Sequence, residues 1–311
     1  EVWRHIKSFA GYSFCKAHSA SYAVESFQSL YLKAHYPLEF QVAVINNFGG
    51  FYPTWVYFNE ARRQGGKIEL PCINNSCEYT RIAGKTIYIG FIHVEHLEKE
   101  TIIRIITERN RNGKFLSFNN FMERVQVKKE QLIILIRIGA LRFTGEQKTS
   151  LLWKSHLYLK KISASPYDPM MFLSPLKKFE LPTLEYSRIK DAYDEIELLG
   201  FTVSIDLFDM LKTGFRGEIM AKDMHKNVGK KLRMAGHMVT VKYVRTIKNE
   251  IMAFGTFIDS SGDFFDTIHF RHSLKDYPFR GEGIYLILGK VTEEFGFPSV
   301  ETEKMAKLPF L

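Results

Sequence analysis

The chain has 311 residues, of which 45% are hydrophobic and 25% are charged, enough apolar material for two or three folded domains. An excess of 43 Lys and Arg over 34 Asp and Glu gives a formal net charge of +9, which favours an acidic polymer as partner. Three cysteines, none in C-x₂-C spacing, argue against a disulfide framework or a structural zinc site and fit a reducing cytoplasm. No apolar run approaches the roughly 18 residues of a membrane span, and the start lacks a signal-peptide pattern. Because the chain begins with Glu1 rather than Met, we expect a piece of a longer protein.

The first half of the sequence predicts helices with a few short strands. Apolar spacing predicts one helix between His18 and Pro37 and a second from Pro37 to Asn47. Thr54 is a plausible N-cap for a helix that reaches Arg63. Strands are expected at Lys67–Leu70 and Thr86–Phe91, and further helices at Glu98–Arg111, after Ser117, at Lys129–Ile138 and at Glu146–Lys161.

The second half changes character after a proline-rich stretch. Four prolines between positions 166 and 182 mark a linker, which is followed by a helix from Ser187 to Leu199. Beyond Lys230 the apolar period changes from about 3.6 to 2, which is typical of strands. The expected strands are Leu232–Tyr243, Glu250–Ile258, Phe264–Phe270 and Gly283–Thr292. A small closed barrel lets so few strands avoid exposed edges.

Polar side chains gather where a loop becomes the first long helix: Lys16, His18, Ser19 and Ser21. Free backbone N–H groups and the positive end of the helix dipole meet there, so a lysine and hydroxyls complete a cradle for phosphate. The alternative is ordinary capping by Ser19 beside a solvated Lys16. These residues alone leave both interpretations open.

Two strings in this region carry a family resemblance. GYSFCKAHSASYA at 11–23 and LKAHYPLEF at 32–40 resemble the fingers region of the alpha subunit of bacterial DNA polymerase III, the C-family replicative polymerase. In that family the fingers bind the triphosphate of the incoming nucleotide. The resemblance therefore implies nucleotide binding by Lys16, His18 and Ser19.

The resemblance also implies a domain order. The expected fold is an α+β multidomain chain, with mostly helical fingers and a helix-hairpin-helix region followed by a C-terminal β-barrel of the OB type. The expected domains are the end of the fingers at 1–85, a tandem helix-hairpin-helix domain at 86–162, a linker with a helix at 163–229 and an OB-fold at 230–311. Arg62 and Arg63, near the end of the first domain, are interpreted as surface charge.

The stretch from Lys99 to Lys148 is basic, with eleven Lys and Arg against five Glu. Such an excess suits contact with duplex phosphates, and the alternative is a solvated helix face. Segments at 90–92 and 138–145 resemble the family's helix-hairpin-helix module, which grips DNA without reading sequence. Where relatives have a glycine-rich first hairpin, this chain has His93–Glu98, without glycine and with two carboxylates. The DNA contacts expected from the second hairpin are Gly139, Arg142, Gly145 and Lys148.

The barrel segment resembles the family's OB-fold, which holds single strands by stacking bases on aromatic side chains above a basic groove. The candidate cations are Lys230, Lys231, Arg233, Lys242, Arg245 and Lys248. The candidate stacking platforms are Phe254, Phe257, Phe265, His269 and Phe270. Alternation along the strands directs only part of the aromatic set outward, so we expect most of them in the core and favour the cations as contacts.

The linker holds a second candidate motif. Residues 168–172, DPMMF, resemble the family's internal clamp-binding peptide, with Asp168 in place of its usual leading Gln. The resemblance implies that Met171 and Phe172 dock in a pocket of the sliding clamp. The alternative is an apolar pair that packs on its own chain.

Two groups of carboxylates are candidate metal ligands, because nucleotidyl transfer of this kind uses two divalent ions. The helix at 187–199 holds Asp191, Asp194, Glu195 and Glu197, which we interpret as a solvated face. A turn holds Asp259, Asp263 and Asp266, which we interpret as turn chemistry. In the resembled family the metal-binding palm precedes the fingers. The resemblance therefore implies Mg²⁺ bound outside this chain and no metal within it.

The sequence thus predicts the C-terminal portion of a DNA polymerase III alpha-type subunit, which acts in template-directed DNA synthesis only as part of the full-length protein. The implied partners are primer–template DNA, single-stranded template, a deoxynucleoside triphosphate, the sliding clamp and other holoenzyme subunits, in the bacterial cytoplasm and without a membrane. Strings at 264–270 and 289–298 resemble a second, error-prone polymerase copy. The alternative function is a non-catalytic DNA- or RNA-binding accessory protein built from the same modules.

Overall fold

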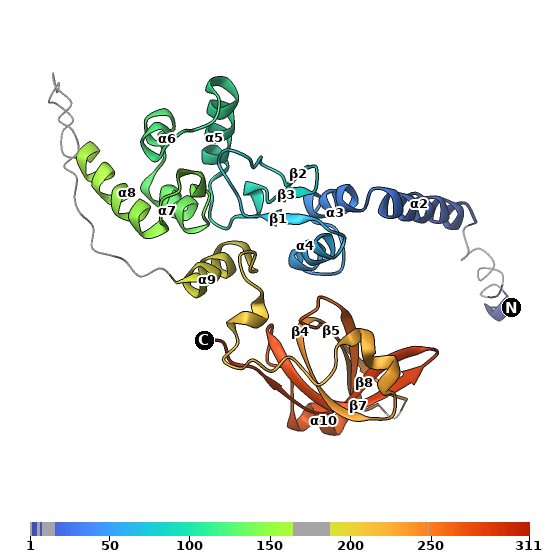
Figure 1. Cartoon of the computed structure of the whole chain (residues 1–311). Coiled ribbons are helices and arrows are strands. Elements are labelled where there is room, and N and C mark those ends of the chain that lie inside the picture. The colour runs from blue at the N-terminus through green and yellow to red at the C-terminus, as the bar shows by residue number, and fades with distance from the viewer. Residues whose placement is uncertain (1, 5–6, 8–15, 164–186, 248) are drawn as a thin grey trace, which may run out of the picture.

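The computed structural model describes residues 2–4, 7, 16–163, 187–247 and 249–311. A mostly helical region comes first and a closed β-barrel follows it, as Figure 1 shows. The α+β class expected from the sequence is therefore confirmed. No helix within the described ranges is both long and apolar enough to cross a bilayer.

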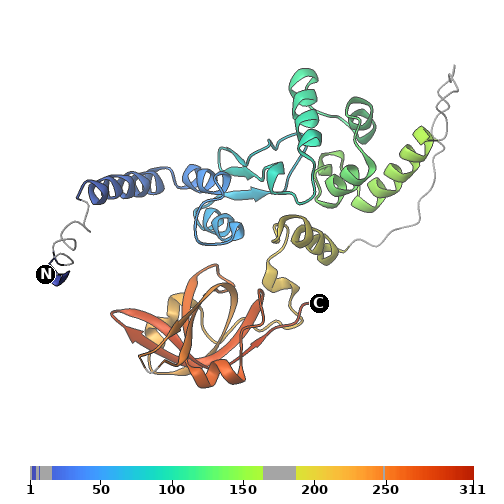
Figure 2. The same cartoon turned by 180° about the vertical axis from the view of Figure 1, so that it is seen from behind.

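The N-terminal region combines three helices with a small sheet. The helices are α2 (Lys16–His35), α3 (Pro37–Asn46) and α4 (Thr54–Arg63), and the strands are β1 (Lys67–Glu69), β2 (Arg81–Ala83) and β3 (Thr86–Tyr88). β3 lies in the middle, parallel to β1 and antiparallel to β2. α2 extends away from the rest of the molecule in both views (Figure 1 and Figure 2), and its apolar side chains, such as Phe27 at 80% exposure, are largely uncovered.

Short helices continue the chain around one shared core. They are α5 (Lys99–Asn112), α6 (Phe118–Arg124), α7 (Lys129–Arg137), α8 (Lys148–Ser163) and α9 (Arg188–Leu199), with 3₁₀ turns η1 (Phe91–His93) and η2 (Arg142–Thr144). The helix expected after Ser117 is confirmed, and Ser117 is its N-cap, because its Oγ accepts a hydrogen bond from the Asn120 N–H at 3.1 Å. Buried side chains from α3 through α9 form a single cluster that includes Phe58, Phe121 and Leu198. The helix after the proline-rich stretch therefore packs on the same core as α5–α8.

The second core lies inside the barrel. Its strands are β4 (Lys231–Arg245), β5 (Ile251–Ile258), β6 (Phe264–His269), β7 (Ile284–Glu294) and β8 (Phe297–Lys307), with α10 (Arg271–Asp276) after β6. The strand order is β4-β5-β6-β8-β7, closed between β7 and β4. Only β6 and β8 pair in parallel, and the other neighbours are antiparallel. The predicted closed barrel is confirmed, and closure removes the sheet edges.

Several boundaries differ from the sequence predictions. α2 begins at Lys16, upstream of the expected start after His18. Strands β2 and β8 were not predicted. The segment before the barrel also holds two 3₁₀ helices, η3 (Leu207–Met210) and η4 (Ala221–Asn227), whose apolar residues pack on the barrel. The residues between α9 and β4, which the sequence assigned to a linker, therefore pack on the barrel.

Candidate nucleic-acid interface

The predicted phosphate cradle lies at the start of α2. Residues 8–15 and the Lys16 side chain fall outside what the structure describes. His18 is exposed, and its ring contacts that of Tyr22 edge-on with centroids 4.5 Å apart. Because Lys16 to Ser19 are all helical, Ser19 lies inside α2, so the alternative of Ser19 as the N-cap is wrong. The nucleotide-binding role of Lys16, His18 and Ser19 stays a prediction.

The basic stretch from Lys99 to Lys148 uses many of its cations internally. Arg109 donates to the carbonyl oxygens of Ile73 and Ser76 at 2.8 and 2.6 Å. Arg124 pairs with Glu108 at 3.0 Å, and its guanidinium lies over the Phe115 ring. Guanidinium groups tied to backbone carbonyls and carboxylates hold the helices together, so the sequence excess overstates the free positive charge on this surface.

The second hairpin shows the same pattern. Arg142 donates to the carbonyl oxygens of Pro71 and Leu70 at 2.7 and 2.8 Å and lies 3.2 Å from a Glu69 carboxylate oxygen. Gly139 and Gly145 have φ of +75° and +71°, a conformation that favours glycine. Their N–H groups donate to Ile136 and Arg142 carbonyl oxygens within the hairpin. These residues therefore have a structural role that the sequence did not indicate.

The first hairpin, His93–Glu98, is also closed by internal contacts. The Glu98 N–H donates to Gln131 Oε1 at 2.7 Å, and the Glu95 N–H donates to the Leu198 carbonyl oxygen at 2.8 Å. His96 has φ of +63°, a left-handed backbone conformation that is uncommon for a residue other than glycine. The N–H groups of Glu95 and Glu98 are thus directed into the protein.

The acidic residues of α9 correct the prediction of a solvated face. Glu195 is completely buried, and its Oε2 accepts hydrogen bonds from the N–H groups of Val203 and Ser204 at 2.6 and 3.0 Å. The other three carboxylates, Asp191, Asp194 and Glu197, contact cations of α7 and α8. Solvation is the wrong interpretation for the buried Glu195 and for Asp191 and Asp194, whose side chains are mostly covered by basic residues far away in the sequence. The Glu197 side chain remains 60% exposed.

The interpretation of the 259–266 carboxylates as turn residues is confirmed for Asp259 and Asp263 and is wrong for Asp266, which lies in β6. Asp259 Oδ1 accepts hydrogen bonds from the N–H groups of Ser261 and Asp263, and Oδ2 accepts one from the Ala221 N–H. Asp266 accepts a hydrogen bond from the Thr256 hydroxyl at 2.8 Å. In the described part of the chain, no three His, Cys, Asp or Glu side chains are placed to hold a metal ion. The residues here do not fit the divalent ions of a polymerase.

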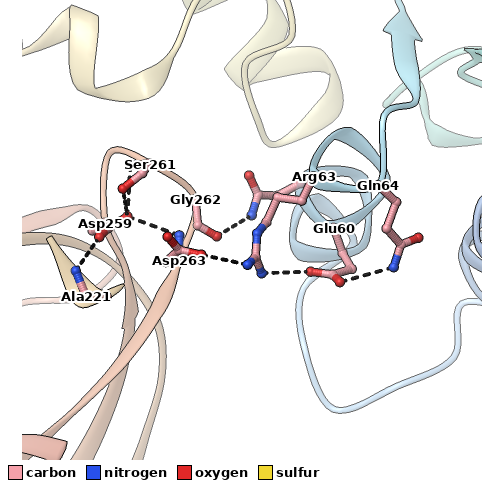
Figure 3. A network of polar contacts seen from close by, with 9 residues as sticks. Glu60, Arg63, Gln64, Ala221, Asp259, Ser261, Gly262 and Asp263 are labelled. Carbon is pink, nitrogen blue, oxygen red and sulfur yellow. Dashed lines mark hydrogen bonds and ion pairs between the residues drawn. The ribbon is translucent and has the colours of Figure 1, made fainter. Parts of the chain in front are cut away.

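The turn at 259–263 also joins the barrel to α4 (Figure 3). Arg63 lies 2.6 Å from Asp263 and 3.2 Å from Glu60, and Asn59 donates to the Gly262 carbonyl oxygen at 3.3 Å. An apolar contact of Val56 with Val239 and Ile258 lies beside it, together with a stack of the Trp55 and His237 rings at 4.1 Å. Arg62 donates to the Val203 carbonyl oxygen, and burial lowers the pKa of its guanidinium. Arg62 and Arg63 are exposed, as their interpretation as surface charge expects, and both also contact segments far away in the sequence.

The candidate platforms on the barrel divide between core and surface. Phe257, Phe265 and His269 are buried, which confirms that most of the aromatic set belongs to the core. Phe254 and Phe270 are 42% and 37% exposed. Exposed aromatic side chains on a strand face are the groups on which bases stack.

Phe254 occupies the centre of a cross-strand row on the outer face. The register pairs it with Lys242 of β4 on one side and Ile268 of β6 on the other. Lys242 is exposed, and Tyr243 beside it is 59% exposed. A cation directly opposite an aromatic ring can bind one nucleotide, because the base can stack on the ring while the phosphate pairs with the cation.

The other candidate cations of the barrel contact neighbouring side chains. Lys231 pairs with Glu303 and Arg233 with Glu218, so these two charges are balanced. Lys230 and Arg245 contact neutral amides, those of Asn227 and Asn249. Lys248 lies outside the described residues. Lys242 and Arg245 therefore offer more unbalanced positive charge to a ligand than Lys231 and Arg233, which are paired with carboxylates.

The comparisons with known proteins agree with this architecture. A family model described as helix-hairpin-helix motif matches residues 65–151. The DNA polymerase III subunit alpha of Borreliella burgdorferi is 27% identical over 99% of this chain and 29% of its own length, and that of Staphylococcus epidermidis is 28% identical over 93% and 28%. The subunit of Treponema pallidum is 28% identical over 84% of this chain and 24% of its own length. The chain thus spans less than a third of these curated relatives. By sequence, and as the fingers-like strings indicated, the chain is similar along most of its length to bacterial DNA polymerase III alpha subunits.

Proposed function

We propose that this chain serves template-directed DNA synthesis as the DNA-holding part of a polymerase whose bond-making metals are bound elsewhere. The support is the similarity along nearly the whole chain to DNA polymerase III alpha subunits, together with the helix-hairpin-helix match and the barrel. Catalysis, Mg²⁺ and the substrate deoxynucleoside triphosphate then belong to the full-length protein. Lys16, His18 and Ser19 are the proposed contacts to the triphosphate, on the resemblance of residues 11–23.

The proposed partners follow from the same relatives. They are primer–template DNA, the single-stranded template, the sliding clamp and other holoenzyme subunits, in the bacterial cytoplasm. The proposed clamp contact, Met171 and Phe172, lies outside the described residues. Gly139, Arg142, Gly145 and Lys148 were expected to contact duplex phosphates, but the internal contacts of Arg142 and Lys148 leave the barrel with the more accessible surface.

The single observation that carries the DNA-binding proposal is the row formed by Lys242, Phe254 and Ile268 across three strands. We propose that a single strand crosses this face, with a base on Phe254 and a phosphate near Lys242. The ring is partly exposed rather than buried in the core, so it can stack without unfolding the barrel.

Replacing Phe254 with alanine tests this function. A base–aromatic stack is worth about 1–3 kcal/mol, so Phe254→Ala is expected to weaken binding of a fluorescent single-stranded DNA roughly 5- to 150-fold. Fluorescence anisotropy titration of the whole chain measures this change. The matched control is Phe264→Ala, which removes a 39% exposed phenylalanine of β6 near Tyr52 and should stay within about twofold of the parent. Equal affinities for the two variants would show that no base stacks at Phe254.

A further inference from the structure

The acidic face of α9 lies against the basic face of the second hairpin. Arg137, at the end of α7, donates through Nε to Asp194 at 2.7 Å and through Nη2 to Glu197 at 2.5 Å. Lys148, at the start of α8, has Nζ 2.9 Å from Asp191 Oδ1. The three carboxylates recur at intervals of three residues and therefore lie on one side of the helix. Both cations flank the hairpin that the family resemblance assigns to DNA.

The end of α9 makes a similar contact with the first hairpin. Its Leu198 carbonyl oxygen accepts the hydrogen bond of the Glu95 N–H at 2.8 Å. Hairpin N–H groups and adjacent cations are the donors that such a module offers to phosphate oxygens. α9 thus offers carboxylate and carbonyl oxygens to the same kinds of donor that a DNA backbone would use.

Burial of the apolar side of α9 stabilises the docking of this helix on the helix-hairpin-helix region. Ala192 is fully buried, and Leu198 and Leu199 are 1% and 9% exposed in the core shared with α5–α8. Removal of the helix would return these side chains to water and leave the partly buried Arg137 without its carboxylates. Two phosphate contacts, which weaken with salt, cannot offset both costs.

We propose that α9 is an internal phosphate mimic that excludes duplex DNA from the hairpin face of the helix-hairpin-helix region. While α9 is docked, Arg137 and Lys148 do not contact DNA, and the chain binds DNA through other surfaces such as the outer face of the barrel. The inference rests on the proposed function, since it concerns which surface of a DNA-binding chain the duplex reaches. It replaces the expectation that Lys148 is a DNA contact.

Two variants of the whole chain test the proposal by anisotropy titration of a 24-base-pair duplex over a series of salt concentrations. Arg137→Gln with Lys148→Gln should leave both the affinity, within about twofold, and the salt slope unchanged. Asp191→Asn with Asp194→Asn and Glu197→Gln should free two cations. Because each phosphate contact contributes about 0.9 to the slope, the slope should steepen by about 1.8, and the affinity at low salt should rise about tenfold.

Two further variants separate this effect from net charge. Glu39→Gln with Glu123→Gln and Glu130→Gln changes the charge equally at exposed positions and should raise the affinity much less. Adding the Arg137 and Lys148 substitutions to the neutralised α9 should return the slope to that of the parent. A loss of parent affinity or slope on replacing Arg137 and Lys148 would overturn the proposal, as would a gain from neutralised α9 no larger than that of the control.

The outcomes also separate this inference from the proposed function. A parent chain that binds neither single-stranded nor duplex DNA at low salt contradicts the proposed function. A gain of duplex binding on neutralising α9 would still support the exclusion, because the freed cations would be responsible. If the neutralised α9 undocks, which hydrogen exchange of residues 188–199 would show, the same cations become free and the same gain is expected.

Discussion

Asp259→Ala should lower the free energy of unfolding by about 3 kcal/mol, because it leaves one buried and two partly buried N–H donors without this acceptor. The side chain is 2% exposed. It accepts hydrogen bonds from the N–H groups of Ala221, Ser261 and Asp263 at 2.7, 2.8 and 3.0 Å, as Figure 3 shows. The Ala221 contact also holds η4, whose Met224 belongs to the barrel core. Urea denaturation should show a lower midpoint without a change in the m-value.

The same turn supplies the control. Asp263 contacts Arg63 across the boundary between α4 and the barrel, and its side chain is 27% exposed. A partly exposed ion pair contributes little, so Asp263→Ala should cost less than about 1 kcal/mol. An Asp259→Ala variant as stable as Asp263→Ala would show that the turn does not depend on this carboxylate.

Mild acid should destabilise the protein through its buried histidines. Burial lowers the pKa of His93, His237 and His269 to about 4, from about 6.5 in an exposed chain. Between these two values the unfolded chain binds protons that the folded protein does not. The free energy of unfolding must therefore be greatest above pH 6.5 and must fall as the pH falls from 6.5 to 4.

His269 makes this prediction specific to the barrel. Its Nε2 lies 2.8 Å from the Thr267 hydroxyl, which itself donates to the Gly255 carbonyl oxygen, so Nε2 carries the proton. Within the described residues Nδ1 is buried and has no hydrogen-bond partner, so protonation there creates an unpaired buried charge. At 1.36 kcal/mol per pKa unit the cost reaches about 3 kcal/mol near pH 4. Urea midpoints at pH 7.5, 6 and 5 should fall in that order, and His269→Gln should reduce the decrease while His272→Gln, at an exposed position, should not. A pH-independent midpoint would contradict the burial argument.

The parts of the fold that the sequence predicted depend on local signals. The Ser117 cap, the termination of α9 by Gly200 and the period-2 pattern of β4–β7 are each encoded within a few residues. β8 had only a weak signal, because the step from its buried Thr302 to the next buried residue, Met305, breaks the period of 2 at a register shift, and Pro298 stands near its start. β2 has only three residues and is stabilised by its pairing with β3, which local sequence does not show.

The candidate site was harder to predict, because the charge of a side chain in the sequence does not show which group that side chain contacts in the folded protein. Arg142 and Lys148 look like phosphate ligands in the sequence, but their partners lie 71 and 43 residues away in Pro71 and Asp191. Arg63 looks like surface charge, but its partner is Asp263. Such pairings are set by tertiary packing, whereas the outward position of Phe254 follows from strand alternation, which the sequence does contain.

The measurement that tests the central claim most directly is titration of the whole chain with single-stranded DNA across a range of salt concentrations, with RNA of the same sequence as competitor. If the chain holds DNA for a polymerase, it binds at low ionic strength, the logarithm of its affinity falls linearly with the logarithm of salt concentration, and DNA competes at lower concentration than RNA. The absence of binding at about 50 mM salt, a salt-independent affinity or a preference for RNA would contradict the account.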